Sequence, residues 1–325
     1  MRALVCKQYG SPDELVVEDL PDPVPGPGQL VVNVEAAGIN FPDVLLIGGQ
    51  YQVKNPLPFV PGREAAGVVE SVGAGVTGFK PGDRVIALPE TGAFAEKCLV
   101  DAALTIPLPD TMDYAQAAGF TITYGTSYHA LKQSAKLQPG ETVLVLGAAG
   151  GVGITAVEIA KALGARVVAA ASSEDKLEFA REAGADETIN YAETGLRDAL
   201  KAIAGKAGVD IVYDPVGGAV AEEALRALAW HGRYLVVGFA SGEIPQFPAN
   251  LALLKEASIV GVWWGTWAQK NPDLQAANMR ELAELVDAKT LKPRVTGTYT
   301  LDEFSQAFRA ITERRVLGKV VFRMR

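Results

Sequence analysis

A glycine-rich segment between an apolar strand and a helix has the composition of a site for a diphosphate. The segment 147–153 reads Gly-Ala-Ala-Gly-Gly-Val-Gly, follows an expected strand at 142–146 and opens an expected helix at 152–163. In dinucleotide sites one glycine permits a sharp turn, a second lets the backbone approach the pyrophosphate, and a third lets helix and strand pack closely. Gly150 and Gly153 hold the second and third positions, while alanine holds the first. This strand–turn–helix context predicts dinucleotide binding, with a tight structural turn that binds nothing as the alternative.

The residues that follow the next expected strand, 166–171, favour NADP over NAD. An NAD site usually carries Asp or Glu at that strand end, where the carboxylate binds the ribose 2′-hydroxyl. Here Ser172 and Ser173 come first, followed by Glu174-Asp175-Lys176. Hydroxyls and a lysine would bind a 2′-phosphate through charge-assisted hydrogen bonds worth about 1.5–3 kcal/mol. Alternatively, Ser173 only caps the next helix, and one of the two carboxylates turns inward.

The pattern of strands and helices predicts an α/β protein with two domains. Up to residue 124, short strands alternate with Pro- and Gly-rich turns, which is typical of a partly open β-barrel. Between 125 and 263, strands that are apolar on both faces alternate with helices, as a doubly wound parallel sheet requires. The last expected strand, 319–323, is predicted to return to the first domain. That domain would then be discontinuous, with residues 1–124 and 264–325.

The composition is that of an ordinary globular enzyme. The chain has 325 residues, of which 49% are hydrophobic and 21% charged, and its net charge is −8. An acidic protein repels phosphate, so neither nucleic acid nor an anionic membrane is an expected partner. Two cysteines build no disulfide framework, and we identify no signal peptide and no apolar run long enough to span a membrane. We therefore expect a cytoplasmic protein.

Five segments match one family, in order and from end to end of the chain. They are Ala36–Asp43, Pro61–Val69, Phe79–Val85, Ala148–Gly153 and Gly318–Val321. Together they resemble the zinc-independent quinone oxidoreductases, or zeta-crystallin-like proteins, a branch of the medium-chain dehydrogenase/reductase superfamily. Alanine at the first glycine position is usual in this branch. The resemblance implies a GroES-like barrel as the catalytic domain, a Rossmann domain, a cleft between them and usually a homodimer.

The resemblance also implies a cofactor, NADPH, and a substrate class, quinones or α,β-unsaturated carbonyls. It places Asn40 near the nicotinamide and Tyr51 at the substrate, and we predict both as catalytic residues. The other residues predicted to bind the cofactor are Thr126, Ala149, Gly150, Gly151, Val152, Ser173, Lys176, Tyr191, Gly238, Phe239, Gly318 and Lys319. Simpler roles stay open for several of them. Asn40 could cap a turn and Thr126 a helix, Tyr51 could be a surface aromatic, Tyr191 could pack the sheet edge, and Lys319 could be solvated.

No metal is expected. Zinc-dependent relatives carry a Cys near Asn40 and a His at the position of Arg63, and arginine stays protonated and cannot ligate a cation. The available ligands lack the spacing of a zinc site and are few: Cys6, Cys98, His129 and His231. Without a Lewis acid, plain carbonyl reduction is poorly supported, which favours more electrophilic acceptors. We predict direct hydride transfer from C4 of the nicotinamide, with a proton from Tyr51 or solvent.

Two other functions remain as alternatives. An enoyl-thioester reductase would need a basic patch for its substrate's phosphates, and no such cluster is evident in the sequence. A non-enzymatic NADPH-binding structural or RNA-binding protein is disfavoured by the acidic charge.

Two further features have more than one interpretation. Trp263, Trp264 and Trp267 could line a substrate or pack at a domain junction or dimer interface. Arg63 could reach the cleft or pair with Glu64 or Asp43.

Overall fold

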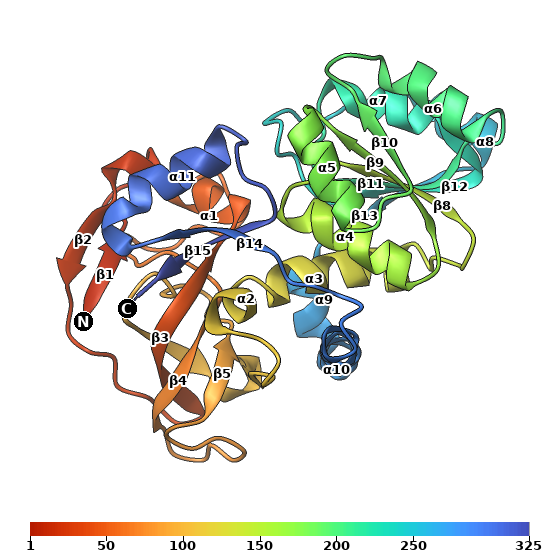
Figure 1. Cartoon of the computed structure of the whole chain (residues 1–325). Coiled ribbons are helices and arrows are strands. Elements are labelled where there is room, and N and C mark those ends of the chain that lie inside the picture. The colour runs from red at the N-terminus through yellow and green to blue at the C-terminus, as the bar shows by residue number, and fades with distance from the viewer. Residues whose placement is uncertain (325) are drawn as a thin grey trace. The chain divides into compact units, whose positions relative to one another are not determined.

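The computed structural model describes residues 1–324, which divide into two compact units (Figure 1). Unit 1 contains Met1–Ile122 and the segment from Pro293 onward, and unit 2 contains Thr123–Lys292. The C-terminal segment thus belongs to the same unit as the N-terminus, as the predicted discontinuous domain requires. Within the described residues, no helix is both long and apolar enough to cross a bilayer.

Unit 1 is built on a sheet with the strand order β14-β15-β3-β4-β5-β7, and β6 pairs with β3. The long strand β3 (Gln29–Ile39) pairs antiparallel with β4 (Ala65–Val72) and with β15 (Lys319–Arg323). Two other strands, β1 and β2, form a separate antiparallel ribbon. The remaining elements of the unit are β1 (Arg2–Val5), β2 (Val16–Asp19), β5 (Arg84–Ala87), β6 (Lys97–Asp101), β7 (Thr105–Pro107), β14 (Val295–Tyr299), α1 (Phe41–Ile47), α2 (Tyr114–Ala118), α11 (Phe304–Thr312) and three 3-10 turns at Pro12–Glu14, Ala102–Leu104 and Leu301–Glu303.

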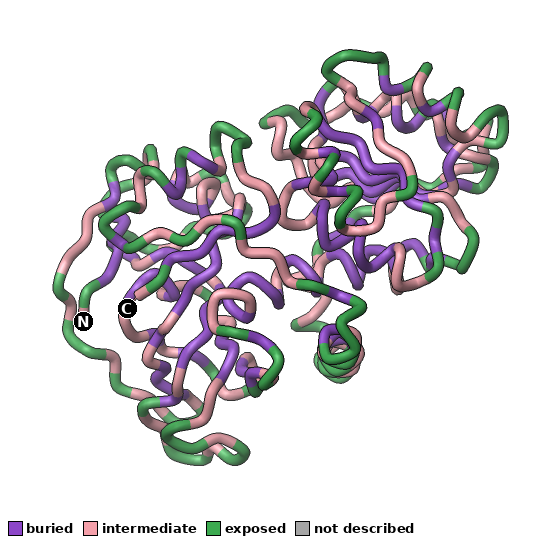
Figure 2. The backbone as a smooth tube through the Cα atoms, in the orientation of Figure 1, coloured by how far each residue is buried: buried purple, intermediate pink, exposed green. Residues whose placement is uncertain are grey.

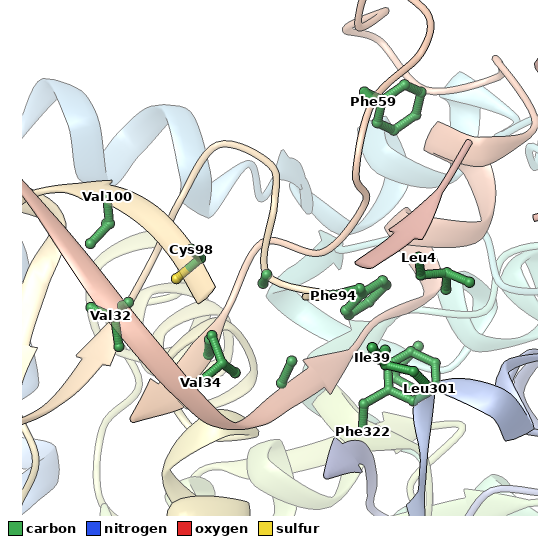
Figure 3. Packing of buried hydrophobic residues seen from close by; sticks show 14 of the residues in the cluster. Leu4, Val32, Val34, Ile39, Phe59, Phe94, Cys98, Val100, Leu301 and Phe322 are labelled. Atoms are coloured by element: carbon green, nitrogen blue, oxygen red, sulfur yellow. The ribbon is translucent and has the colours of Figure 1, made fainter. Parts of the chain in front are cut away.

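The core of unit 1 joins strands that lie far apart in the sequence (Figure 3). Val32 and Val34 of β3 both point into the core, because side chains two residues apart lie on the same face of a strand. The ring of Phe94 packs edge-to-face on Phe322 of β15, with 5.0 Å between ring centroids. The C-terminal strand therefore completes both the sheet and the core of this unit.

Unit 2 contains a six-stranded parallel sheet with the order β10-β9-β8-β11-β12-β13. Helices flank this sheet on both sides, and its strands are largely buried (Figures 1 and 2). The order reverses between β8 and β11, and ligands of such folds bind outside the carboxyl ends of the strands at that point. The elements are β8 (Thr142–Leu146), β9 (Arg166–Ala171), β10 (Glu187–Asn190), β11 (Val209–Asp214), β12 (Leu228–Val236), β13 (Ser258–Gly261), α3 (Thr121–Tyr128), a π-helix (His129–Ser134), α4 (Gly151–Ala162), α5 (Glu174–Glu182), α6 (Leu196–Ala204), α7 (Ala219–Arg226), α8 (Ala249–Lys255), α9 (Trp264–Lys270) and α10 (Pro272–Asp287).

The predicted fold class is confirmed, but one domain boundary and one helix start differ. Residues 264–292, which we assigned to the barrel domain, belong to unit 2. The reason is packing within unit 2: the Trp267 ring stacks on His129 at 4.1 Å, and Asn278 accepts a hydrogen bond from Gln133. The helix predicted to begin at Thr126 begins at Thr121, so Thr126 lies inside α3 and does not cap it.

Candidate active site

The glycine turn of unit 2 has the geometry of a diphosphate cradle. Gly147 follows β8 with φ +56°, and Gly150 is the N-cap of α4 and offers no side chain to its first turn. A Cβ on Gly153 would lie 2.1 Å from the carbonyl oxygen of Gly147, so only glycine fits there. The first N–H groups of a helix have no intrahelical partner, which leaves those of α4 for an anion.

The turn after β11 packs against this glycine turn. A Cβ on Gly147 would lie 2.7 Å from the Val216 side chain. Buried Asp214 ends β11; its carboxylate accepts from the N–H groups of Val216 and Gly217, at 2.7 and 2.9 Å, and from the Tyr234 hydroxyl at 2.6 Å. Burial raises the pKa of this carboxyl, against the effect of those hydrogen bonds. Asp214 thus fixes the turn that supports the cradle.

Sequence reasoning did not single out Asp214. The available signal was an aspartate at the end of an apolar strand, followed by Gly217 and Gly218, and both glycines have φ +67°.

Two predicted cofactor residues lie beside this turn. The N–H of Gly238 donates to the Asp214 carbonyl at 3.3 Å, and the Phe239 ring lies 3.1 Å from where a Cβ on Gly217 would stand.

The residues predicted to hold a 2′-phosphate gather at the carboxyl ends of β9 and β10. The Lys176 ammonium donates to the Ser172 hydroxyl at 3.1 Å, and the Tyr191 N–H donates to the Ala171 carbonyl at 3.1 Å. Ser173 is the N-cap of α5, but its side chain makes no cap hydrogen bond. The carboxylate of Glu174 forms an ion pair with Arg181 at 2.7 Å on the same helix. A cation and hydroxyls therefore occupy this edge, and Glu174 is held by Arg181.

A buried polar network in unit 1 surrounds Asn40. The Asn40 amide donates to the Glu64 carboxylate at 2.9 Å, and its oxygen accepts from the Lys319 ammonium at 2.5 Å. Lys319 also donates to the Ile39 carbonyl at 2.9 Å and pairs with Glu64 at 2.7 Å. The side chain of Lys319 is 8% exposed and that of Glu64 is 0% exposed. Lys319 is therefore no solvated strand residue: its three N–H groups have three acceptors inside unit 1. Gly318, which precedes it, has φ +63°.

Asp43 is the second buried carboxyl of this network. One of its oxygens accepts from the Asn40 N–H at 2.7 Å, and the other is buried without a hydrogen-bond partner among the described residues. Burial raises the pKa of Asp43 to about 7, while the positive charges of Lys319 and Arg63 act in the opposite direction. A carboxyl in this position holds a proton at mildly acidic pH.

Tyr51 and Arg63 form a half-buried pair beside this network. The chain turns after α1 so that the Tyr51 N–H donates to the Leu45 carbonyl at 3.1 Å, and the Tyr51 side chain packs on the core of unit 1. The guanidinium carbon of Arg63 lies 6.0 Å from the centre of the Tyr51 ring. Tyr51 is therefore not a free surface aromatic.

The comparisons with known proteins cover both units. Residues 26–110 match the alcohol dehydrogenase GroES-like domain, and residues 151–284 match the zinc-binding dehydrogenase family. The chain is 40% identical to quinone oxidoreductase-like protein 2 of Bos taurus, over 100% of this chain and 93% of that protein. It is 36% identical to the quinone oxidoreductase of Rattus norvegicus, over 94% of this chain and 92% of that protein.

The chain belongs to the quinone oxidoreductase branch of the medium-chain dehydrogenase/reductase superfamily. A crystal structure of Escherichia coli quinone oxidoreductase complexed with NADPH superposes on this quinone oxidoreductase family member with a TM-score of 0.93. The two proteins share 29% identity, and the match covers 100% of each chain. The predicted resemblance and the predicted pairing of a GroES-like domain with a Rossmann domain are thus confirmed.

The residues of this quinone oxidoreductase family member do not fit the zinc that one matched family is named for. No group of three or more His, Cys, Asp or Glu side chains in the part of the chain that the structure describes could hold a metal ion. Cys6 and Cys98 are buried in the core of unit 1, and burial raises the pKa of Cys98 to about 12, which disfavours the thiolate that a metal needs. His129 stacks on Trp267 in unit 2.

Proposed function

We propose that this protein is an NADPH-dependent oxidoreductase that reduces quinones or activated alkenes without a metal. The main observation behind the proposal is the glycine turn. A Cβ at position 153 would clash with the Gly147 carbonyl oxygen, so only glycine fits there and only backbone lines the start of α4. The similarity to quinone oxidoreductases, one of them complexed with NADPH, supports the same function. When bound, NADPH would supply a hydride from C4 of its nicotinamide and would leave as NADP⁺.

Different residues of the protein would bind different parts of the cofactor. The N–H groups of Ala149, Gly151 and Val152 would hold the diphosphate, and Gly150, whose own N–H donates to the Gly147 carbonyl at 3.0 Å, would let it approach the backbone. Lys176, with the hydroxyls of Ser172 and Ser173, would hold the 2′-phosphate, because the ammonium adds a charge-assisted bond. Asn40 would hold the nicotinamide end in a fixed orientation, since Glu64 and Lys319 fix its amide. Tyr51 or water would supply the proton.

The decisive experiment titrates the protein with NADPH and with NADH and follows intrinsic fluorescence and melting temperature. It then measures oxidation of each cofactor against a panel of benzoquinones, enals and enoyl thioesters. We expect tighter binding of NADPH and turnover with quinones or enals. Equal binding of NADH would overturn the cofactor assignment. Turnover restricted to thioesters would favour an enoyl-thioester reductase, and binding without turnover would favour a non-enzymatic role.

We further propose that two copies pair through the free edge of β13. This strand is the last in the sheet of unit 2, and its Ile259 is 41% exposed. Leu253 and Leu254 of α8, just before it in the chain, are 78% and 67% exposed. An unpaired edge beside exposed apolar side chains is a surface on which another strand can add. Light scattering should report a monomer for Ile259→Lys, which puts a charge on this edge. The control Val24→Lys, at an exposed position of unit 1, should remain a dimer. A monomeric wild-type protein would refute the pairing.

A further inference from the structure

One cation beside the Asn40 network, Arg63, forms no close ion pair with any described residue, although its charge acts on Asp43. Lys319 is neutralised by Glu64, and the Asp43 carboxyl is engaged by the Asn40 N–H. Arg63, by contrast, makes no hydrogen bond and no ion pair with any described residue, although it is half-buried and its neighbour in sequence is Glu64. A half-buried guanidinium without an acceptor is costly unless something else supplies one.

The backbone fixes where this guanidinium points. Gly62 has φ +94°, and a Cβ there would lie 2.5 Å from the Phe94 ring. Only glycine fits at this position, which fixes the backbone just before β4. Arg63 lies in a bend just before β4. The Glu64 side chain is fully buried in the network, whereas the guanidinium carbon of Arg63 lies over the Tyr51 ring, 6.0 Å from its centre. Arg63 and Tyr51 therefore share one half-buried face of unit 1.

Another arginine of unit 1 shows what a structural arginine looks like here. The guanidinium of Arg84 stacks over the Tyr114 ring at 5.1 Å, as Arg63 does over Tyr51. Arg84 also donates to the Met112 carbonyl at 3.1 Å and pairs with Asp110 at 3.4 Å. The stacking of Arg84 is therefore accompanied by a hydrogen bond and an ion pair within unit 1. Among the described residues Arg63 has the stacking contact and a longer-range attraction to Asp43 but no hydrogen bond, so its five N–H donors have no acceptor there.

We propose that Arg63 binds the oxygen of the electron acceptor and stabilises the oxyanion that forms there during reduction. This inference rests on the proposed function and names the group that does the work of a Lewis acid. When an enone gains a hydride at its β-carbon from NADPH, a new C–H bond forms and the C=C electron pair moves to leave an enolate oxyanion. A quinone that accepts the same hydride, hydrogen included, becomes a hydroquinone monoanion. The Tyr51 hydroxyl or water then supplies the proton, and the acceptor is reduced while the nicotinamide is oxidised.

The kinetic test compares Arg63→Met, Arg63→Lys and the matched control Arg84→Met. We expect Arg63→Met to lower kcat/KM for the acceptor about tenfold to hundredfold, since loss of one oxyanion donor costs that order of magnitude or more. NADPH affinity should stay within about twofold of wild type, and Arg63→Lys should recover part of the loss because it restores the charge. Arg84→Met should leave the acceptor kinetics unchanged.

Two readouts separate this role from a structural one. The loss in Arg63→Met should shrink as the acceptor carries stronger electron-withdrawing substituents, because a more stable oxyanion needs less help. Millimolar guanidinium chloride should restore part of the activity, and the same concentration of sodium chloride should not. An equal loss for all acceptors, or weaker NADPH binding of the same size, would overturn the proposal.

A binding experiment tests the site without turnover. 4-Nitrophenol, whose phenolate has its own absorption band, imitates the product oxyanion. In the presence of NADP⁺, the wild-type protein and Arg84→Met should bind the phenolate and lower the apparent pKa of the bound phenol, and Arg63→Met should not. Phenolate binding that is the same in Arg63→Met would refute the inference. Failure of the proposed function would be distinct, since it would abolish NADPH binding or turnover in the wild type.

Discussion

The two sites of the molecule handle charge in different ways. The glycine turn of unit 2, residues 147–153, contains no ionisable side chain, and its polar groups are backbone N–H groups at the start of α4. The network of unit 1 is built around side chains, and it buries two carboxyls, Glu64 and Asp43, with one ammonium, Lys319. The first site depends on the absence of side chains, and the second depends on partners that distant parts of the chain supply. The two sites should therefore fail in different ways.

The largest effect is expected from Gly153→Ala. Its Cβ would stand 2.1 Å from the Gly147 carbonyl oxygen, so α4 must move away from β8, and NADPH binding should be lost together with several degrees of melting temperature. Gly265→Ala in α9 is the control, because a Cβ there meets nothing within 4 Å. Calorimetry and fluorescence titration measure both quantities. A Gly153→Ala variant that binds NADPH normally would contradict this account of the turn.

Gly150→Ala sharpens the same point. Its Cβ would keep 3.4 Å from the Gly147 oxygen, so we expect the fold to survive while the pyrophosphate loses its close approach to the backbone. The expected result is a near-normal melting temperature with weaker NADPH binding.

The next largest effect is expected from Lys319→Met. This change leaves Glu64 charged, fully buried and unpaired, and should lower the free energy of unfolding by about 3–5 kcal/mol. Lys319→Met combined with Glu64→Met should recover most of that loss. Lys97→Met is the control, because Lys97 pairs with Asp22 and Glu70 at the surface, where such pairs are worth about 1 kcal/mol or less. Denaturant titration distinguishes the outcomes, and equal losses for the two single variants would refute the difference.

Asp43→Asn should change how stability depends on pH. The folded pKa of Asp43, about 7, lies above its value of 3.8 in an unfolded chain, because burial disfavours the charged form. Ionisation thus lowers wild-type stability as the pH rises from about 4 to 7. The variant lacks this loss and should gain on the order of 4 kcal/mol relative to wild type across that window. Melting temperatures between pH 4 and 8 test this prediction. A parallel pH dependence in both proteins would contradict it.

The smallest effect is expected at the edge of unit 2. Lys176→Ala should weaken NADPH binding about tenfold and leave NADH binding unchanged, since it removes one charge-assisted bond to the 2′-phosphate. Lys206→Ala, at an exposed position of the same unit, is the control. Equal weakening of both cofactors would place Lys176 elsewhere in the site.

Much of unit 2 could be predicted because its signals are local. The glycine turn lies within seven consecutive residues, and the apolar strands alternate with helices in chain order. The strands predicted at 142–146 and 166–171 have the bounds that the structure gives β8 and β9. The short strand β1 was missed because its few residues do not show the alternation of apolar and polar side chains that indicates a strand. The helix α1 was missed because its seven residues follow a strand directly and contain proline.

The site in unit 1 could be predicted only in part. The family segments pointed to Asn40 and Lys319, but nothing in the spacing of the sequence showed that Glu64 joins them. Such a network depends on the pairing of β15 with β3, and pairing between distant strands leaves no local signal. The same limit applies to Arg63, for which the sequence left open a place in the cleft or an ion pair with Glu64 or Asp43. Lys319 takes the Glu64 carboxylate instead.

The place of β15 in the sheet also determines the order in which a ribosome can complete the two units. Lys319 meets the carbonyl of a residue 280 positions earlier in the chain, and β15 lies between β14 and β3. All strands of the unit 2 sheet emerge between residues 142 and 261. During translation the nucleotide-binding sheet can close first, while β3 keeps an open edge and Glu64 lacks its cation. A premature stop before residue 319 would release a chain with a full Rossmann sheet and no means to neutralise Glu64.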